Sequence, residues 1–134
     1  MRLMLLIVMS VIAPFAVLPV FADDVKPDPR ENLNTAIPEA IRLLEAKEYK
    51  AFLKSFMTPD NFKKFTATES LEKFAKEWGE RKGLILLKVC KVIKDAKPTL
   101  DDTGTKATFT IKEAIAGKKS ITFVKVEKHW CIRN

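Results

Sequence analysis

The chain has few of the residues from which catalytic and metal sites are most often built. It contains one histidine, His129, and two cysteines, Cys90 and Cys131. Zinc sites take three or four ligands at characteristic spacings, which these three residues do not provide. The four glycines form neither a phosphate-binding loop nor a nucleophile elbow. The sequence therefore predicts no catalytic residue, no cofactor and no metal ligand, and it favours a binding protein over an enzyme.

No long segment of the chain carries charges of only one sign. The 24 lysines and arginines exceed the 17 aspartates and glutamates, for a net charge of +7, but the two signs are interleaved along nearly every segment. A nucleic-acid-binding surface needs a concentrated basic stripe, so this pattern argues against that class. The charge excess predicts at most a weak contact with anionic surfaces such as lipid headgroups.

The longest apolar run is at the N-terminus. Arg2 precedes an almost wholly apolar stretch over residues 3–20, and the small residue Ala22 fits a signal-peptidase cleavage site. A retained membrane anchor is the alternative, since the run is nearly long enough to cross a bilayer. Two prolines within the run would interrupt such a helix. Residues 1–22 are therefore predicted to be a signal peptide, whose cleavage leaves an exported, periplasmic or secreted protein.

The rest of the chain divides into a short polar segment and one domain. Residues 23–30 are polar and contain two prolines, which is typical of a flexible tether. Residues 31–134 contain no internal repeat, and their length suits a single hydrophobic core. Nothing in the sequence sets the oligomeric state.

Apolar residues recur at helical spacing after the tether. A first stripe covers residues 33–44, and Pro38 belongs in the first turn of a helix, which predicts a start near Thr35 or Ala36. A second stripe covers residues 49–56, either as a separate helix or as a continuation of the first.

Two further helix starts follow. Thr58-Pro59-Asp60 combines an N-cap residue, a proline at the first helical position and an acidic residue near the positive end of the helix. Thr66 and Glu69 have the spacing of a capping box, which predicts that a helix opens there and continues to Trp78.

Residues 84–97 fit two structures. As a strand, their faces are not separated, because lysines interrupt both sides. At helical spacing the apolar residues cluster and the lysines lie opposite, so the pattern favours a helix that ends at Pro98. The two glycines before it, Gly79 and Gly83, either break it from the preceding helix or only weaken the join.

The last third of the chain alternates apolar and polar residues, as strands with one buried face do. Strands are predicted over residues 105–112, 121–126 and 129–132, with a two-residue turn at Glu127-Lys128 that pairs Val126 with His129. One face of the hairpin then forms part of the core, and its residues are Ile121, Phe123, Trp130 and Ile132. The opposite face carries Val124, Val126, His129 and Cys131.

The C-terminal hairpin resembles that of the nuclear-transport-factor-2-like (cystatin-like) superfamily. Many of those chains end in the pattern Phe-x-Lys-x-Asp-Gly-Lys-Trp-x-Ile, which Phe123, Lys125, Trp130 and Ile132 match, with Lys128 in place of the glycine. The resemblance implies a four-stranded sheet with residues 84–95 as a strand. It implies no catalytic residue, because enzymes of the superfamily place Asp, His or Tyr inside the concave pocket, where the residues expected here are apolar apart from Lys125.

Together these patterns predict an α+β fold, in which about three to five N-terminal helices pack on one face of a C-terminal three-stranded antiparallel meander. The alternative is the four-stranded cystatin-like sheet that the resemblance implies.

The sequence does not decide whether the two cysteines form a disulfide. An oxidising compartment favours a Cys90–Cys131 disulfide. The predicted faces oppose it, since Cys131 lies opposite the core residues Trp130 and Ile132 whereas Cys90 lies at the edge of the core stripe of its helix.

Two sets of residues are candidates for binding. Four aromatic residues either line a ligand pocket or simply fill the core: Trp78, Phe109, Phe123 and Trp130. Val124 and Val126 form a partly apolar outer face, which either meets a partner or is covered by the N-terminal region of the chain. The sequence thus predicts a non-enzymatic exported domain that binds an unidentified protein or a small apolar ligand. An enzyme with a superfamily-type pocket and a weak binder of anionic envelope surfaces are the alternatives.

Overall fold

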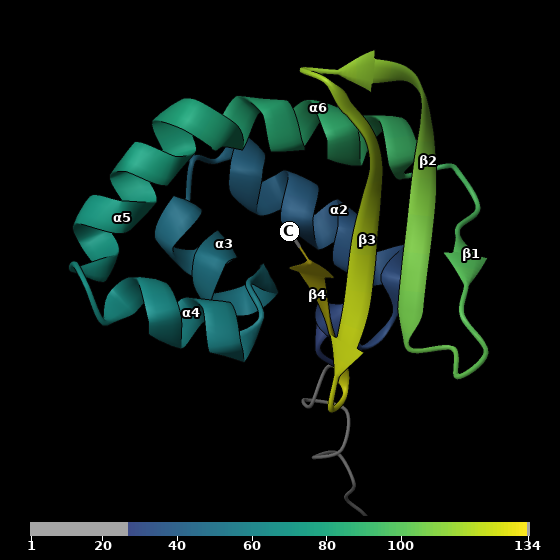
Figure 1. The fold of residues 1–134 in the computed structure, drawn as a ribbon, viewed down its shortest axis with the longest axis horizontal. Helices are drawn as coiled ribbons and strands as arrows, with labels where there is room; N and C mark the ends of the chain where they lie inside the picture. Colours follow the sequence, from purple (N-terminus) through teal and green to yellow (C-terminus); the bar gives the residue numbers. More distant parts are fainter. Residues whose placement is uncertain (1–26, 134) are drawn as a thin grey trace, which may run out of the picture.

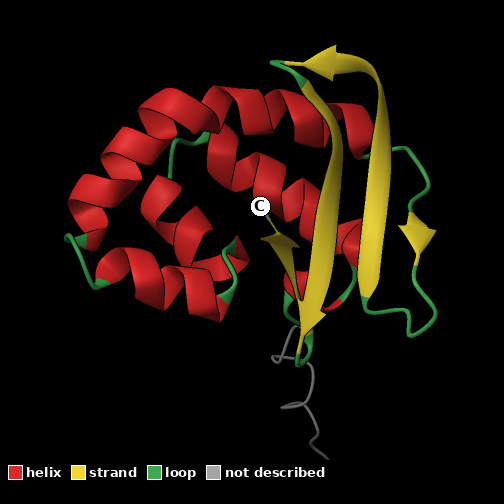
Figure 2. Cartoon of the chain, in the orientation of Figure 1, coloured by secondary structure: helices red, strands yellow, loops and turns green. Residues whose placement is uncertain are grey.

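The computed structural model describes residues 27–133, so the predicted signal peptide lies outside the described residues. Helices form the first part of the described chain and a four-stranded antiparallel sheet the last (Figure 1; Figure 2). The helical elements are η1 (Pro29–Glu31), α2 (Leu33–Glu45), α3 (Tyr49–Phe56), α4 (Pro59–Thr66), α5 (Leu71–Trp78), the π-helical turn η2 (Gly79–Gly83) and α6 (Leu84–Ile93). The strands are β1 (Thr99–Leu100), β2 (Lys106–Ile115), β3 (Lys118–Val126) and β4 (His129–Arg133). The predicted α+β class is confirmed.

The sheet has the strand order β1-β2-β3-β4, in which every strand pairs with the next along the chain. The predicted register of the hairpin is confirmed, since Val126 pairs with His129 and Phe123 with Ile132. The sheet has four strands, as in the alternative prediction, but the additional strand is the two-residue β1. Residues 84–93 form α6, as their helical spacing predicted, but the helix ends at Ile93 and not at Pro98. The strand implied there by the resemblance is not formed.

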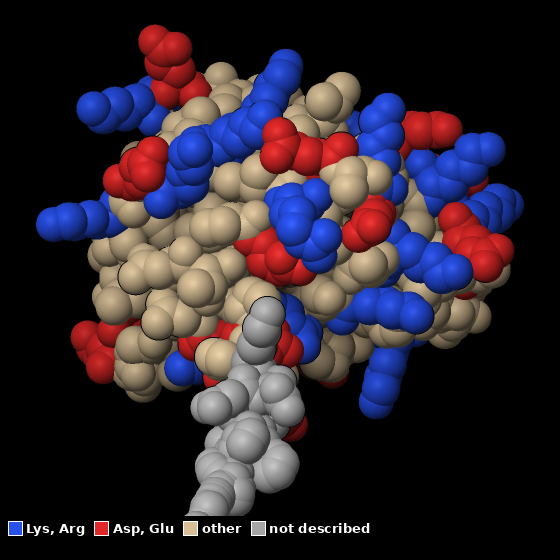
Figure 3. All heavy atoms as spheres, turned by 180° about the vertical axis from the view of Figure 1, so that it is seen from behind, with Lys and Arg blue, Asp and Glu red and all other residues tan. Residues whose placement is uncertain are grey.

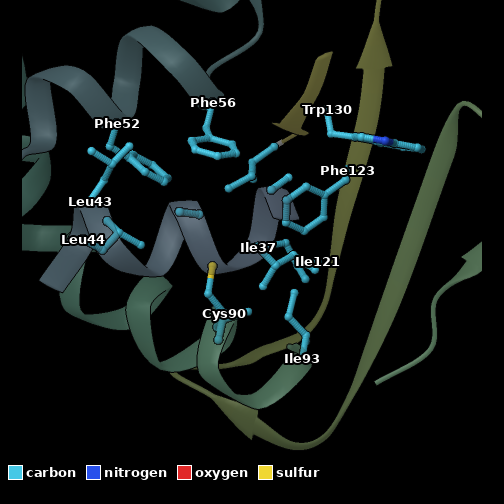
Figure 4. Packing of buried hydrophobic residues seen from close by; sticks show 14 of the residues in the cluster. Ile37, Leu43, Leu44, Phe52, Phe56, Cys90, Ile93, Ile121, Phe123 and Trp130 are labelled. Atoms are coloured by element: carbon cyan, nitrogen blue, oxygen red, sulfur yellow. The ribbon is translucent and has the colours of Figure 1, made fainter. Parts of the chain in front are cut away.

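The core lies between the helices and one face of the sheet (Figure 4). The four residues predicted for the core face of the hairpin are all buried, with exposed fractions from 0% to 6%. Phe56 from α3 is fully buried in the same core, and Phe109 packs edge-on against Phe123 with their ring centroids 5.8 Å apart. Burial of such large apolar side chains is the main stabilising contribution to a fold of this size.

Two predicted helix starts are wrong. Helix α2 begins at Leu33, because the side chain of Asn32 accepts a hydrogen bond from the Asn34 N–H and so caps the helix earlier. Pro38 therefore lies inside the helix, at an exposed position where water can bind the carbonyl that a proline leaves unpaired.

The predicted capping box at Thr66 does not open a helix either, because α4 extends through that residue. The N-cap of α5 is Ser70, whose hydroxyl accepts from the Lys73 N–H at 3.3 Å.

The structure also settles the two helix connections that the sequence left open, between α2 and α3 and between α5 and α6. Lys47 has a φ of 59° between α2 and α3, so the second apolar stripe is a separate helix. At Gly79–Gly83 the chain stays helical as η2, so the glycines do not separate α5 from α6. None of the described helices has the length and apolar character needed to span a membrane.

Candidate functional site

All four aromatic candidates are buried in the core cluster, where Figure 4 shows Phe123 and Trp130. Of the four, Trp78 also borders a hollow at the surface. The hollow lies where the end of α5, η2 and the start of α6 approach the turn between β2 and β3. Its volume is about 320 Å³, at the small end of the range for ligand pockets. We call it the Trp78 pocket, and its lining residues are Trp78, Lys82, Ile85, Leu86, Ala116, Gly117 and Lys118.

The walls of the Trp78 pocket are held in place by packing on both sides. The indole of Trp78 stacks on Phe52 with the ring centroids 5.3 Å apart, and Tyr49 meets its ring edge-on at 6.0 Å. Ala116 and Gly117, with φ values of 51° and 81°, form the tight turn that brings β3 back from β2. A stacked indole and a tight turn make a preformed wall, which lowers the entropic cost of binding a ligand.

Two lysines give the pocket its electrostatic character. Among the described residues, neither Lys82 nor Lys118 has a carboxylate within ion-pair distance. Beside apolar walls their ammonium groups favour an anion, because the local dielectric constant is lower there than in water. Among residues 27–133, no carboxylate or histidine lines the pocket, so this lining offers no acid–base pair for catalysis.

His129 lies elsewhere, in a polar cluster that the sequence did not predict. Its Nε2 is 3.3 Å from Oδ2 of Asp28, and the same oxygen lies 2.8 Å from Nη2 of Arg30. Arg30 also donates from Nη1 to the main-chain oxygen of Ser55 at 2.9 Å. The hydrogen bonds from Arg30 hold the pKa of Asp28 at about 2, below the usual 3.8. We call these residues the Asp28 cluster; they join the N-terminal segment, β4 and α3.

The Asp28 cluster changes the description of the predicted tether. Residues 23–26 lie outside the described part of the chain, but Pro29–Glu31 form η1, and this element lies against β4. The ion pair with Asp28 and the bond to Ser55 hold Arg30 there, which composition alone did not indicate. The N-terminal segment therefore covers the outer sheet face at His129, whereas Val124 and Val126 of the same face border a separate hollow.

Cys131 lies on this covered face, and Cys90 lies in the core on the other side of the sheet. Both are free thiols in the structure, with exposed fractions of 4% and 0%. Burial raises the pKa of both thiols, to about 12 for Cys90. The Sγ of Cys131 lies 4.0 Å from the main-chain oxygen of His129. This contact involves the main chain and not the imidazole ring, so it does not place His129 as a base for the thiol.

The other predicted surface residues, Val124 and Val126, are half-buried. They border a separate hollow of about 490 Å³ together with the start of α4. Within residues 27–133, no group of three or more His, Cys, Asp or Glu residues is placed to hold a metal ion. Basic and acidic side chains are interleaved on the face shown in Figure 3, in agreement with the sequence pattern.

No family model matches the chain, and neither a curated protein nor a solved structure matches it. The resemblance to the nuclear-transport-factor-2-like superfamily therefore stays a prediction. Sequence reasoning had singled out Trp78 but missed its partners in the pocket, the two lysines and the turn at Ala116–Gly117. They are far apart in the chain, and only the packing of η2 near the β2–β3 turn brings them together.

Proposed function

We propose that the protein is an exported, non-enzymatic binding domain that holds a small organic anion with an apolar body in the Trp78 pocket. The observation that carries the proposal is the combination of a packed indole, two aliphatic side chains and two lysines around one hollow, and within residues 27–133 neither lysine has a carboxylate at ion-pair distance. The apolar walls bind the body of the ligand, and the ammonium groups of Lys82 and Lys118 bind its charged end. Export rests on the signal-peptide pattern of residues 1–22.

The direct test is a titration of the purified protein with anilinonaphthalene sulfonate, an anion with an aromatic body. We expect binding, and we expect the double substitution Lys82→Gln and Lys118→Gln to weaken it about tenfold, because two charge-assisted contacts are lost. A matched control replaces Lys63 and Lys97, which are exposed and do not line the pocket. An equal loss of affinity in both double variants would contradict a site at the Trp78 pocket.

A second titration separates the apolar contribution from the charge. The substitution Leu86→Trp adds volume to the wall of the pocket and is expected to reduce binding of the same probe. When the probe is added, the amide NMR signal of Gly117 should shift in the unmodified protein and should not shift in the variant. Binding of a cationic naphthalene derivative with the same affinity as the anion would exclude the proposed charge selectivity.

Location and natural ligand are tested together by native mass spectrometry of protein recovered from the exported fraction of the cell. An N-terminus at Asp23 is expected if the signal peptide is removed. A copurifying anionic small molecule would support the proposal, and retention of residues 1–22 would contradict the exported soluble form.

A further inference from the structure

Another hollow region surrounds Tyr49, apart from the Trp78 pocket and from the hollow beside Val124 and Val126. Two hollows of about 690 Å³ and 520 Å³ meet there, and both are lined by Lys47, Tyr49 and Lys76. The first lies between α3 and α5, and the second extends past η2 to Leu84 and Leu87 at the start of α6. We call the two together the Tyr49 groove; it shares no lining residue with the Trp78 pocket.

Two glycines in η2 leave space for the Tyr49 ring in this groove. A Cβ atom at Gly79 would lie 2.2 Å from Cδ2 of Tyr49, and one at Gly83 would lie 2.7 Å from Cε1. Only glycines in η2 therefore leave room for the ring. The ring is half-exposed, and its edge-on contact with Trp78 fixes its position. A rigid, partly exposed tyrosine loses little conformational entropy on binding, which is why this residue is common at protein interfaces.

Apolar side chains also line the groove. Leu84 has 65% of its surface exposed and Leu87 is only partly buried, although both belong to α6. The other hollow contributes Ala51, which is exposed, and Ala75, which is buried. An elongated apolar floor of this kind fits a peptide segment better than a small molecule.

The charges around the groove are unevenly paired. Three of its four glutamates already have a cationic partner: Glu72 lies 3.1 Å from Lys50, Glu45 lies 3.0 Å from Lys91, and Glu48 lies 4.0 Å from Arg42.

In contrast, three lysines of the groove have no carboxylate within that distance in the described part of the chain, namely Lys47, Lys54 and Lys76. Glu80 is the remaining glutamate. The lining of the whole groove holds four lysines and four glutamates, and its excess of positive charge lies in the first hollow, where four lysines accompany two glutamates.

From this complementarity we propose that the Tyr49 groove binds an acidic segment of a partner protein that carries leucine-like side chains between its carboxylates. The apolar side chains of the segment contact Tyr49, Leu84 and Leu87, and its carboxylates pair with Lys54 and Lys76. Both contacts are needed, because exposed ion pairs alone contribute little to binding and an apolar floor alone does not select charge.

The test uses a fluorescent synthetic peptide with glutamate and leucine at helical spacing, titrated into the purified protein at moderate salt. The double substitution Lys54→Glu and Lys76→Glu is expected to weaken binding more than tenfold, since it replaces two attractions with two repulsions. The matched control is Lys94→Glu with Lys97→Glu, which makes the same change in net charge at exposed positions outside the groove. The control variant should bind the peptide with an affinity within about twofold of that of the unmodified protein.

A separate variant tests the apolar contacts of the peptide. Leu84→Ser removes an exposed side chain, so folding is preserved, and it is expected to weaken the peptide complex about threefold to tenfold. Equal weakening by the control pair, or no binding of the peptide, would overturn the proposal. So would equal binding of a peptide in which lysine replaces glutamate, or tight binding to phosphatidylglycerol vesicles that does not depend on Leu84, since these outcomes indicate non-specific or membrane contact.

Discussion

The carboxylate of Asp28 lies 3.3 Å from Nε2 of His129, although the two residues come from opposite ends of the described chain. Asp28 is held there by the guanidinium of Arg30, which bonds both of its oxygens. The N-terminal segment is thereby fixed over β4 and the buried thiol of Cys131, so the contact couples the stability of the sheet to the ionisation of one carboxylate.

The Asp28→Asn variant should lower the free energy of unfolding near neutral pH by about 1 kcal/mol, because it removes a charge-assisted pair at a partly exposed site. The folded-state pKa of Asp28 is about 2, below its ordinary value of 3.8, so the unfolded chain binds more protons between these values. The stabilisation is therefore complete above about pH 4 and is lost as the pH falls towards 2. Urea unfolding across this range should show the two proteins converging at low pH.

The matched control for that experiment is Asp102→Asn, at an exposed position with no ion pair among the described residues. It should leave the free energy of unfolding within about 0.5 kcal/mol of the unmodified protein. A constant difference between Asp28→Asn and the unmodified protein down to pH 2 would mean that the variant acts through packing and not through the charge.

Gly79→Ala should destabilise the fold by about 1–3 kcal/mol, although alanine favours helices by about 1 kcal/mol over glycine. The cause is the overlap of the new methyl group with the Tyr49 ring. In a Tyr49→Ala background that overlap is absent, so the same substitution should become neutral or stabilising. Urea unfolding of the four proteins in this double-mutant cycle measures the change of sign, and additive effects would contradict the proposed clash.

The turn between β3 and β4 provides a third prediction. Glu127 has a φ of 59°, in the left-handed region that costs a residue with a side chain about 1 kcal/mol. Glu127→Gly should therefore raise the melting temperature of the domain. Lys128→Gly should lower it, because Lys128 does not have a positive φ and glycine only adds entropy to the unfolded chain there. Calorimetry that showed the same sign for both would contradict this turn geometry.

The parts of the fold that were predictable are those set by local periodicity. Alternation gave the face and the register of the hairpin at Phe123 and Ile132, and helical spacing identified α6 in spite of its β-branched residues. The errors lie where two local signals competed. Pro38 indicated a later start for α2, but the helix begins at its cap, Asn32. The capping-box spacing indicated Thr66 as the cap of α5, but the cap is Ser70.

The candidate binding regions were less predictable, because they depend on contacts between distant segments. Trp78 could be named from its type, but the approach of Lys82 to Lys118 follows from the packing of η2 near the β2–β3 turn. The same holds for Asp28, which composition placed in a tether and which Arg30 and His129 fix to the domain. Such contacts have no signature in a single sequence, because the residues involved are ordinary surface types.

The two thiols provide the last prediction. In the folded protein neither Cys90 nor Cys131 should react with iodoacetamide near neutral pH, because both are buried and burial raises their pKa, to about 12 for Cys90. Reaction needs an exposed thiolate, so both should be modified once urea unfolds the chain, without any reductant. Mass spectrometry of the product should show two added groups. A product with no added group and two hydrogens fewer would reveal a disulfide, and it would require one of the thiols to cross from its present side of the sheet.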